Sequence, residues 1–253
     1  MRLFQRSFRV SSFCCAEFIS HDSESRREST KPPVLRVPRA KTRLHVNPLS
    51  PELLGRPLEV PDFQTLFADT CLPLHLDLGC AYGEFCLQLA EQSSSANFLG
   101  IDLRDRVLDR ARAVAADKGR RRNVAFLSLN IRHPHFLHTL LAEYKGPLVS
   151  VTCLFPDPWR QQSERRKRLL QPELASSVAE VMSPGGTFVT ATDCLELAIE
   201  MRSCFDDPQR WRNAATDASG FISQSPYSVR TAWEATVQGR RSPIYWTQHV
   251  RHS

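Results

Sequence analysis

The sequence predicts an α/β protein built around one mainly parallel sheet. From residue 70 onward, short apolar runs of strand length alternate with longer segments in which apolar residues recur at helical spacing. This alternation is typical of βαβ units, whose right-handed crossovers place helices on both faces of the sheet. With 42% hydrophobic and 24% charged residues over 253 residues, the composition is that of a globular protein with one large domain.

Five apolar runs are predicted to form strands. They span residues 74–78, 97–101, 124–129, 148–155 and 187–192. Helices are predicted between them, at residues 84–92, at residues 104–118 and from Leu170 to Val181. The triplet Pro184-Gly185-Gly186 is expected to end the last of these helices, because proline and glycine both interrupt helical structure.

The N-terminal region differs from the rest of the chain. Residues 1–45 hold ten basic and four acidic residues and account for the whole net charge of +6, since the other 23 basic and 23 acidic side chains balance. The first fifteen residues are rich in arginine and serine and contain no acid, which is typical of organellar transit peptides. Residues 1–41 are therefore predicted to be a disordered extension, either a transit peptide or a simple tail. Residues 42–253 are predicted to form the folded domain.

Other classes of protein fit the sequence poorly. No run of about 18 apolar residues is present, so no membrane-spanning helix is predicted. The eight cysteines include no C-x-x-C pair and no Cys/His spacing typical of zinc, so they are expected to be reduced thiols and no metal site is expected. Because the body is neutral, any attraction to a polyanion must come from local clusters of charge.

The first predicted strand ends in a glycine-containing segment, Asp77-Leu78-Gly79-Cys80-Ala81-Tyr82-Gly83-Glu84. Ligands of open α/β sheets bind at the carboxyl ends of strands, and glycine there allows close approach of a ligand. The spacing is not G-x-G-x-x-G, so a dinucleotide fits poorly. A cofactor with a carboxylate and an amine fits better, with backbone amides on the carboxylate and Asp77 facing the ammonium. A purely structural turn is the alternative.

Two further polar residues close the next strands. Asp102 lies 25 residues after Asp77, where an acid can bind ribose hydroxyls or cap the helix that begins near Arg104. Asn130 can read the edge of an adenine or form a simple turn. The combination of the glycine loop and Asp102 favours a cofactor that contains adenosine.

The fourth predicted strand ends in Phe155-Pro156-Asp157-Pro158-Trp159. Two prolines restrict the backbone around one carboxylate, which suits a positioned catalytic acid, although a stiffened turn is the alternative. The following basic tract, Arg160 to Arg168, carries five basic residues against Glu164 alone. Its place beside the predicted pocket favours contacts with the phosphates of a nucleic acid over an ordinary solvated face.

In these residues the chain resembles the tRNA (guanine-N7)-methyltransferase family over about residues 42–250. The P-D-P-W sequence with its basic tract is the most specific feature. The resemblance is carried by Leu76-Asp77-Leu78-Gly79, Gly100-Ile101-Asp102, Asn130, Phe155 to Arg168, Thr190-Ala191-Thr192-Asp193 and Thr231-Ala232-Trp233-Glu234. The segment His45-Val46-Asn47-Pro48-Leu49 is also similar to its counterpart in cyanobacterial and plastid-type members.

The resemblance implies a Rossmann-like class I methyltransferase fold, with a seven-stranded, mainly parallel sheet whose last strand is antiparallel. It implies S-adenosylmethionine as methyl donor, tRNA as substrate and Asp157 as catalytic residue. The implied cofactor-binding residues are Asp77, Gly79, Asp102, Asn130 and Asp157. The implied substrate-binding residues are Gln161, Asp193, Thr231 and Glu234. The basic tract is expected to contact the RNA backbone through Arg160, Arg165, Arg166, Lys167 and Arg168.

The implied chemistry needs no strong general base. Guanine N7 has a free lone pair and loses no proton when it takes a methyl group, while the ring becomes cationic and Asp157 can stabilise that charge. Three residues depart from the family's usual pattern, since Gln161 replaces lysine, Glu164 replaces histidine and Thr236 replaces arginine. Each change lowers the positive charge near the expected RNA path, and Arg160 and Arg165 are available to compensate.

Two other functions stay open. One is a non-catalytic RNA-binding protein on a degenerate methyltransferase fold, motivated by Gln161 and Glu164, which a calorimetric test of cofactor binding would separate from an enzyme. The other is a methyltransferase for a substrate other than tRNA, against which the basic tract argues. The expected location is an organelle, the plastid before the mitochondrion, with the cytoplasm as alternative. A monomer or homodimer without an obligate partner subunit is expected.

Overall fold

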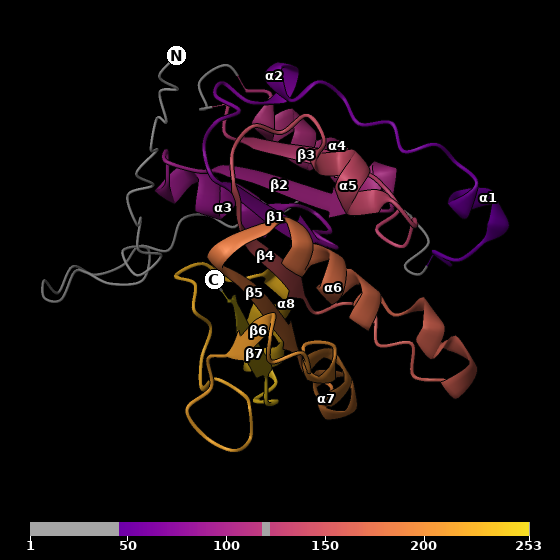
Figure 1. The fold of residues 1–253 in the computed structure, drawn as a ribbon, viewed down its shortest axis with the longest axis vertical. Coiled ribbons are helices and arrows are strands. Elements are labelled where there is room, and N and C mark those ends of the chain that lie inside the picture. Colours follow the sequence, from indigo (N-terminus) through magenta and orange to yellow (C-terminus); the bar gives the residue numbers. More distant parts are fainter. Residues whose placement is uncertain (1–45, 118–121, 253) are drawn as a thin grey trace, which may run out of the picture.

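The computed structural model describes residues 46–117 and 122–252, which form one seven-stranded sheet between two layers of helices (Figure 1). The strand order is β3-β2-β1-β4-β5-β7-β6. The strands are β1 (Leu74–Leu78), β2 (Asn97–Asp102), β3 (Val124–Ser128), β4 (Leu148–Leu154), β5 (Met182–Thr192), β6 (Trp211–Asn213) and β7 (Tyr245–Arg251). The first five pair in parallel, and β7 is antiparallel to both β5 and β6. The predicted sheet, with its antiparallel last strand, is confirmed, whereas the predicted extension at residues 1–41 lies outside the described residues.

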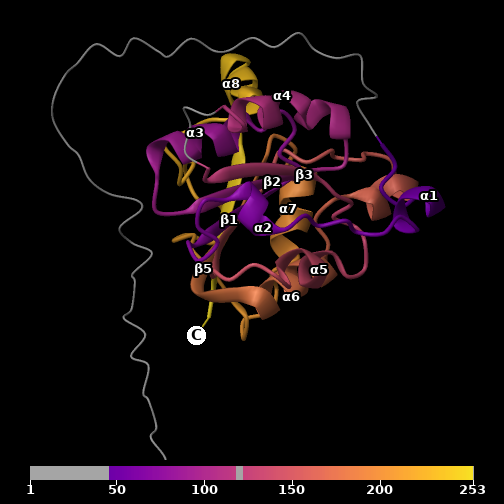
Figure 2. The same ribbon diagram turned by 90° about the horizontal axis from the view of Figure 1, so that it is seen from above.

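Helices cover both faces of the sheet (Figure 2). One face carries α3 (Glu84–Gln92), α4 (Asp105–Ala115) and α8 (Ala232–Gly239). The other carries α2 (Phe63–Leu66), α5 (Phe136–Leu141), α6 (Pro172–Val181) and α7 (Leu195–Ser203). The short helix α1 (Pro51–Leu54) and a 3₁₀ helix (Gln162–Lys167) lie next to the loops at the carboxyl ends of the strands.

The central strands are buried on both sides, as parallel strands between helices must be. Every residue of β1 and β2 is buried. The apolar stripe of α4, formed by Val107, Leu108 and Ala111, is buried against β2 and β3, which explains why its helical spacing could be recognised in the sequence. The five predicted strands and three predicted helices are all observed, with ends that differ by a few residues. The helices α1, α2, α5, α7 and α8 and the strands β6 and β7 were not located from the sequence.

One prediction, that Pro184-Gly185-Gly186 marks a break after a helix, is wrong. Helix α6 ends at Val181 and β5 begins at once with Met182, so the triplet lies inside the strand. The register with β4 shifts there, from the pair Leu148–Met182 to the pair Ser150–Thr187. Gly185, at φ +79°, supplies the backbone conformation that this irregularity needs. The strand therefore absorbs the turn-forming residues as a bulge.

The strand order places a topological switch point between β1 and β4. From β1 the chain crosses to β2 and β3 on one side, and from β4 it crosses to β5 on the other. The loops that follow β1 and β4 therefore diverge, and ligands of such sheets bind in the crevice between them. The glycine segment after β1 and the P-D-P-W loop (Phe155 to Trp159) after β4 are these two loops.

Candidate active site

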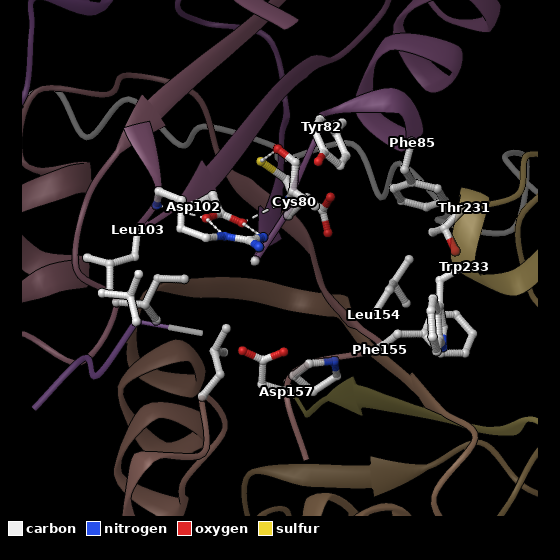
Figure 3. A pocket seen from close by; sticks show the side chains of 18 of the residues that line it. Cys80, Tyr82, Phe85, Asp102, Leu103, Leu154, Phe155, Asp157, Thr231 and Trp233 are labelled. Atoms are coloured by element: carbon white, nitrogen blue, oxygen red, sulfur yellow. Dashed lines mark hydrogen bonds and ion pairs between the residues drawn. The ribbon is translucent and has the colours of Figure 1, made fainter. Parts of the chain in front are cut away.

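A cavity of about 510 Å³ opens at this switch point, at the carboxyl ends of β1, β2 and β4 (Figure 3). Val46 and Pro48 of the N-terminal segment and one side of α8 complete its wall. In Figure 3, Asp102 lies at one end, Phe85 and Trp233 lie at the other, and Asp157 faces the hollow from the opposite wall. The predicted site residues that line the cavity are Asp77, Gly79, Asp102, Asn130, Asp157, Lys167 and Thr231.

Asp77 reaches the cavity floor from the end of β1 and is almost fully buried. The Thr152 hydroxyl donates to its Oδ1 at 2.6 Å, and the Cys86 thiol lies 3.7 Å from its Oδ2. Since Thr152 gives its only proton to the carboxylate, Nε2 of His75 must be the donor in its 3.2 Å contact with the same hydroxyl. Burial raises the pKa of Asp77 from 3.8 to about 6, so the site holds a poorly compensated carboxylate that would gain from a cationic ligand.

The glycine loop offers fewer free amides than the sequence suggested. The amides of Gly79 and Cys80 both donate to the Ile101 carbonyl, and that of Gly83 donates to the Cys80 carbonyl. The amide of Ala81 donates to Asp102. The loop keeps this shape because Gly79 and Gly83 adopt φ values of +81° and +70°. An anion at this end of the sheet would therefore meet the first turn of α3 rather than the whole loop.

Asp102 at the end of β2 is held by an ion pair that the sequence analysis missed. Its Oδ1 accepts from the backbone amide and Nε of Arg104, at 2.9 and 3.0 Å, and its Oδ2 accepts from Ala81 and from Nη2 of Arg104, both at 3.0 Å. These bonds fill the acceptor sites of the carboxylate. A ligand hydroxyl at Asp102 would therefore have to replace part of the Arg104 guanidinium. The hydrogen bonds to Asp102 raise the pKa of Arg104, and the charge of Asp157 adds to this effect.

Asn130 follows β3 and forms the turn that was the alternative to an adenine contact. Its Oδ1 accepts from the amide of Arg132 at 3.0 Å. Its Nδ2 donates to the Pro48 carbonyl at 2.9 Å, which fixes the N-terminal segment against the cavity. The predicted contact with a cofactor base stays a prediction.

The P-D-P-W loop has a strained backbone on both sides of its acid. Phe155 and Trp159 adopt φ values of +51° and +38°, which are uncommon for residues with bulky side chains. The amide of Phe155 donates to the Ala191 carbonyl of β5 at 2.7 Å. Asp157 lies between the two strained residues, is exposed and lines the cavity. The Asp157 carboxylate therefore faces the cavity from a strained backbone, and other contacts must hold that backbone in place.

Arg168 provides those contacts, and this corrects its predicted role. Its side chain is only 3% exposed, so it does not fit the RNA-backbone contact that the sequence predicted. Its Nε donates to the Pro158 carbonyl at 2.8 Å, and its Nη2 reaches the Trp159 carbonyl at 3.5 Å. The same guanidinium forms ion pairs with Glu196 and Glu200 of α7. Arg168 therefore fastens the P-D-P-W loop to α7.

Other side chains of the basic tract are also paired. Arg165 forms ion pairs with the same two acids of α7, Glu196 and Glu200. Lys167 pairs with Glu164 at 2.8 Å and lies 4.6 Å from the centre of the Trp159 ring. Arg160 and Arg166 are exposed. The tract thus presents less free positive charge than its sequence suggested, and Arg160 and Arg166 are its most accessible cations.

The predicted substrate residues fall into two groups. Thr231 lines the cavity and caps α8, since its hydroxyl accepts from the amide of Glu234 at 3.0 Å. Glu234 is buried beside it, and burial raises its pKa. Gln161 and Asp193 are exposed and lie outside the cavity lining, after β4 and β5 respectively.

The cavity also contains residues that sequence reasoning did not assign. Arg104 and Arg132 line it beside Asp102 and Asn130. Arg240 lines it from the end of α8 together with Trp233 and Thr236. The spacing of these three residues, three and then four apart, is that of one helical face, so a helix beginning after Thr231 would have indicated Arg240.

The arrangement suits transfer of a group between two ligands. A buried acid and an ion-paired acid lie on one side, an exposed acid on a rigid loop lies on the other, and the cavity volume is within the range of small-molecule sites. Within the described ranges, no cluster of three or more His, Cys, Asp or Glu side chains could hold a metal ion. In the same part of the chain, no helix is both long and apolar enough to cross a bilayer.

Fold and site together define a class I methyltransferase. The structure of the 16S rRNA methyltransferase KamB shares the fold, with a TM-score of 0.55 and 17% identity over 79% of this chain and 98% of that one. A family model described as "Putative methyltransferase" matches residues 72–246.

Similarity to cyanobacterial proteins identifies the family more closely. The tRNA (guanine-N(7)-)-methyltransferase of Synechococcus elongatus is 33% identical over 215 residues, which are 84% of this chain and 97% of that protein. Its namesake from Thermosynechococcus vestitus is 34% identical over 217 residues, or 83% and 95% of the two chains. The chain belongs to the tRNA (guanine-N(7)-)-methyltransferase family.

The burial of Asp77 predicts that its carboxylate lowers the free energy of unfolding of the protein near neutral pH. The pKa of Asp77 is higher in the folded than in the unfolded protein, so stability is lost as the pH rises from about 4 to 6. At pH 7.5 the Asp77→Asn variant should therefore be more stable by up to about 3 kcal/mol, a difference that shrinks below pH 6. Urea unfolding of both proteins between pH 4.5 and 7.5 measures it. A difference that does not change with pH, or a less stable variant at pH 7.5, contradicts the account.

The attachment of the P-D-P-W loop predicts unequal roles for two neighbouring arginines. Arg168→Met removes the donor to the buried Pro158 carbonyl and should lower the free energy of unfolding by about 1–3 kcal/mol and slow methyl transfer. Arg165→Met removes ion pairs to the same glutamates but no loop contact, so it should cost less than about 1 kcal/mol. Urea unfolding and transfer rates at saturating tRNA provide the comparison. Equal effects of the two variants would contradict the positioning role of Arg168.

Proposed function

We propose that this protein transfers a methyl group from S-adenosylmethionine to N7 of a guanine in tRNA. The observation that carries the proposal is the single cavity that joins Asp77 and Asp102 to Asp157. Its support comes from membership in a family whose named relatives are tRNA (guanine-N(7)-)-methyltransferases.

The residues at the ends of β1 and β2 fit the methyl donor. The buried carboxylate of Asp77, with its raised pKa, suits the ammonium group of a bound amino acid. Asp102 would accept from ribose hydroxyls in place of part of the Arg104 guanidinium, and Asn130 and Gly79 border the same space. When bound, S-adenosylmethionine supplies an electrophilic methyl group on a sulfonium centre.

The loop after β4 fits the acceptor. Guanine N7 needs no base to free its lone pair, so the protein has only to align the ring and stabilise the positive charge that develops on it. The exposed carboxylate of Asp157 supplies that charge stabilisation and can accept from the N–H groups of the base. Thr231 faces the same cavity from the start of α8.

The rim of the cavity fits a nucleic acid. Arg160 and Arg166 are exposed and follow the P-D-P-W loop directly, so they can contact phosphates. Gln161 and Asp193 lie at the same carboxyl edge of the sheet, outside the cavity, and are proposed to contact the tRNA beyond the methylated base. The retained cofactor acids favour an active enzyme over a degenerate binding fold.

Asp157→Asn should lower the rate of methyl transfer to tRNA at least about 100-fold, because the neutral amide cannot stabilise a cationic ring. Transfer of a labelled methyl group to unmodified tRNA measures the rate, and calorimetry of S-adenosylmethionine binding separates a loss in the transfer step from a loss of donor affinity. Asp109→Asn, the same change at an exposed site on α4, is the matched control and should keep full activity. Full activity of Asp157→Asn would contradict the assigned role.

We also propose that the protein acts in an organelle, with the plastid favoured. The cyanobacterial origin of the relatives supports this, together with the arginine- and serine-rich composition of residues 1–41. Residues 1–45 fused to a fluorescent protein should direct it to plastids. Cytosolic fluorescence would contradict the proposal.

A further inference from the structure

The cavity has a source of positive charge outside the basic tract, on α8. Arg165 and Arg168 are engaged by Glu196 and Glu200, and Lys167 by Glu164. Arg240, at the end of α8, is exposed and lines the cavity, and among the described residues it forms no ion pair. Its guanidinium is therefore available to a ligand.

Arg240 is combined with an exposed aromatic ring. Its guanidinium carbon lies 5.6 Å from the centre of the Trp233 ring, a cation–π distance. The Trp233 side chain is 46% exposed and lines the same cavity. Thr236 separates the two along the helix and also lines the cavity. The three side chains form one continuous face of α8 that is turned to the mouth.

The helix that carries this face is firmly anchored. The Thr231 hydroxyl caps it, Glu234 and Val237 are buried, and Trp233 lines the cavity (Figure 3). A single exposed aromatic residue is common on protein surfaces and by itself means little. Here an exposed indole lies beside a guanidinium at the same cavity, and these two groups have the chemistry to contact the base and the phosphate of one nucleotide.

We propose that Trp233 and Arg240 form a second nucleotide subsite, which binds the tRNA nucleotide that flanks the methylated guanosine. This inference rests on the proposed function. The indole stacks on the flanking base, as aromatic side chains do when they hold unpaired nucleotides. Arg240 pairs with the phosphate of that nucleotide through its planar fork of donors. The subsite reads no base sequence, since every base has a face that can stack.

The subsite also accounts for the departure at position 236. The family's usual arginine is replaced there by Thr236, and Arg240 restores a cation one helical turn further along the same face. A cation is therefore present on this face of α8 in spite of Thr236. It now lies where it can pack on Trp233, which positions the guanidinium before the RNA binds.

The test compares tRNA binding by the full-length protein and four variants over a range of salt concentrations. Arg240→Ala should weaken binding about tenfold and lower the slope of log affinity against log salt by about 1, because one phosphate contact is lost. Trp233→Ala should weaken binding about fivefold or more with little change of slope, and Trp233→Phe should keep most of the affinity. Arg241→Ala removes the same charge from the neighbouring residue, which does not line the cavity, and should match wild type.

Calorimetry of S-adenosylmethionine binding distinguishes a failure of the proposed subsite from a failure of the proposed function. All four variants should bind S-adenosylmethionine as wild type does. Wild-type affinity of both Arg240→Ala and Trp233→Ala for tRNA would overturn the subsite and leave the proposed function standing, as would equal losses in Arg240→Ala and Arg241→Ala. Absence of tRNA binding by the wild-type protein would overturn the proposed function itself.

Discussion

The site depends on a charge that the fold keeps out of water. Asp77 lies next to the end of β1, at the point where the loops after β1 and β4 diverge, and its carboxylate is almost completely buried. The groups that touch it, the Thr152 hydroxyl and the Cys86 thiol, are neutral. A buried charge with only neutral partners opposes folding, and it persists because the surrounding strands leave it no alternative position. The same charge becomes favourable as soon as a cation enters the cavity.

The second constraint is the attachment of the P-D-P-W loop. Two bulky residues in uncommon backbone conformations hold Asp157 between them, and strain of this kind lasts only where other contacts determine the backbone. Arg168 makes those contacts through two loop carbonyls and two glutamates of α7. The basic tract therefore serves two purposes. Arg168 holds the P-D-P-W loop in place, and the exposed Arg160 and Arg166 remain available to RNA.

Much of the fold, and the residues at the floor of the site, could be predicted from the sequence. Many strands and helices follow from local periodicity, and Asp77, Asp102 and Asp157 could be singled out because each lies at or near the carboxyl end of a strand, at the same edge of the sheet. The role of Arg168 could not, because Glu196 and Glu200 lie about thirty residues further along the chain and only the fold brings them together. The ion pair of Arg104 with Asp102 is local, two residues along the chain, and was missed because Asp102 was considered only as a ligand contact or a helix cap. Arg240 was missed because the helix after Thr231 was not predicted.

The Pro184-Gly185-Gly186 triplet illustrates a different limit of sequence reasoning. These residues interrupt regular structure in isolation, and the prediction placed them outside the strand. In the sheet, β5 pairs with β4 on both sides of the triplet, at Met182 and from Thr187 onward, and the register shift accommodates the extra residues. Tertiary pairing thus decides the outcome where local preference alone would give a turn.

The most direct test of the central claim is the identity of the product. Unmodified bulk tRNA is incubated with the purified protein and S-adenosylmethionine. It is then digested to nucleosides and analysed by mass spectrometry against standards. The account predicts that N7-methylguanosine is the methylated nucleoside that accumulates with time. Accumulation of a different methylated nucleoside, or of none, would contradict it.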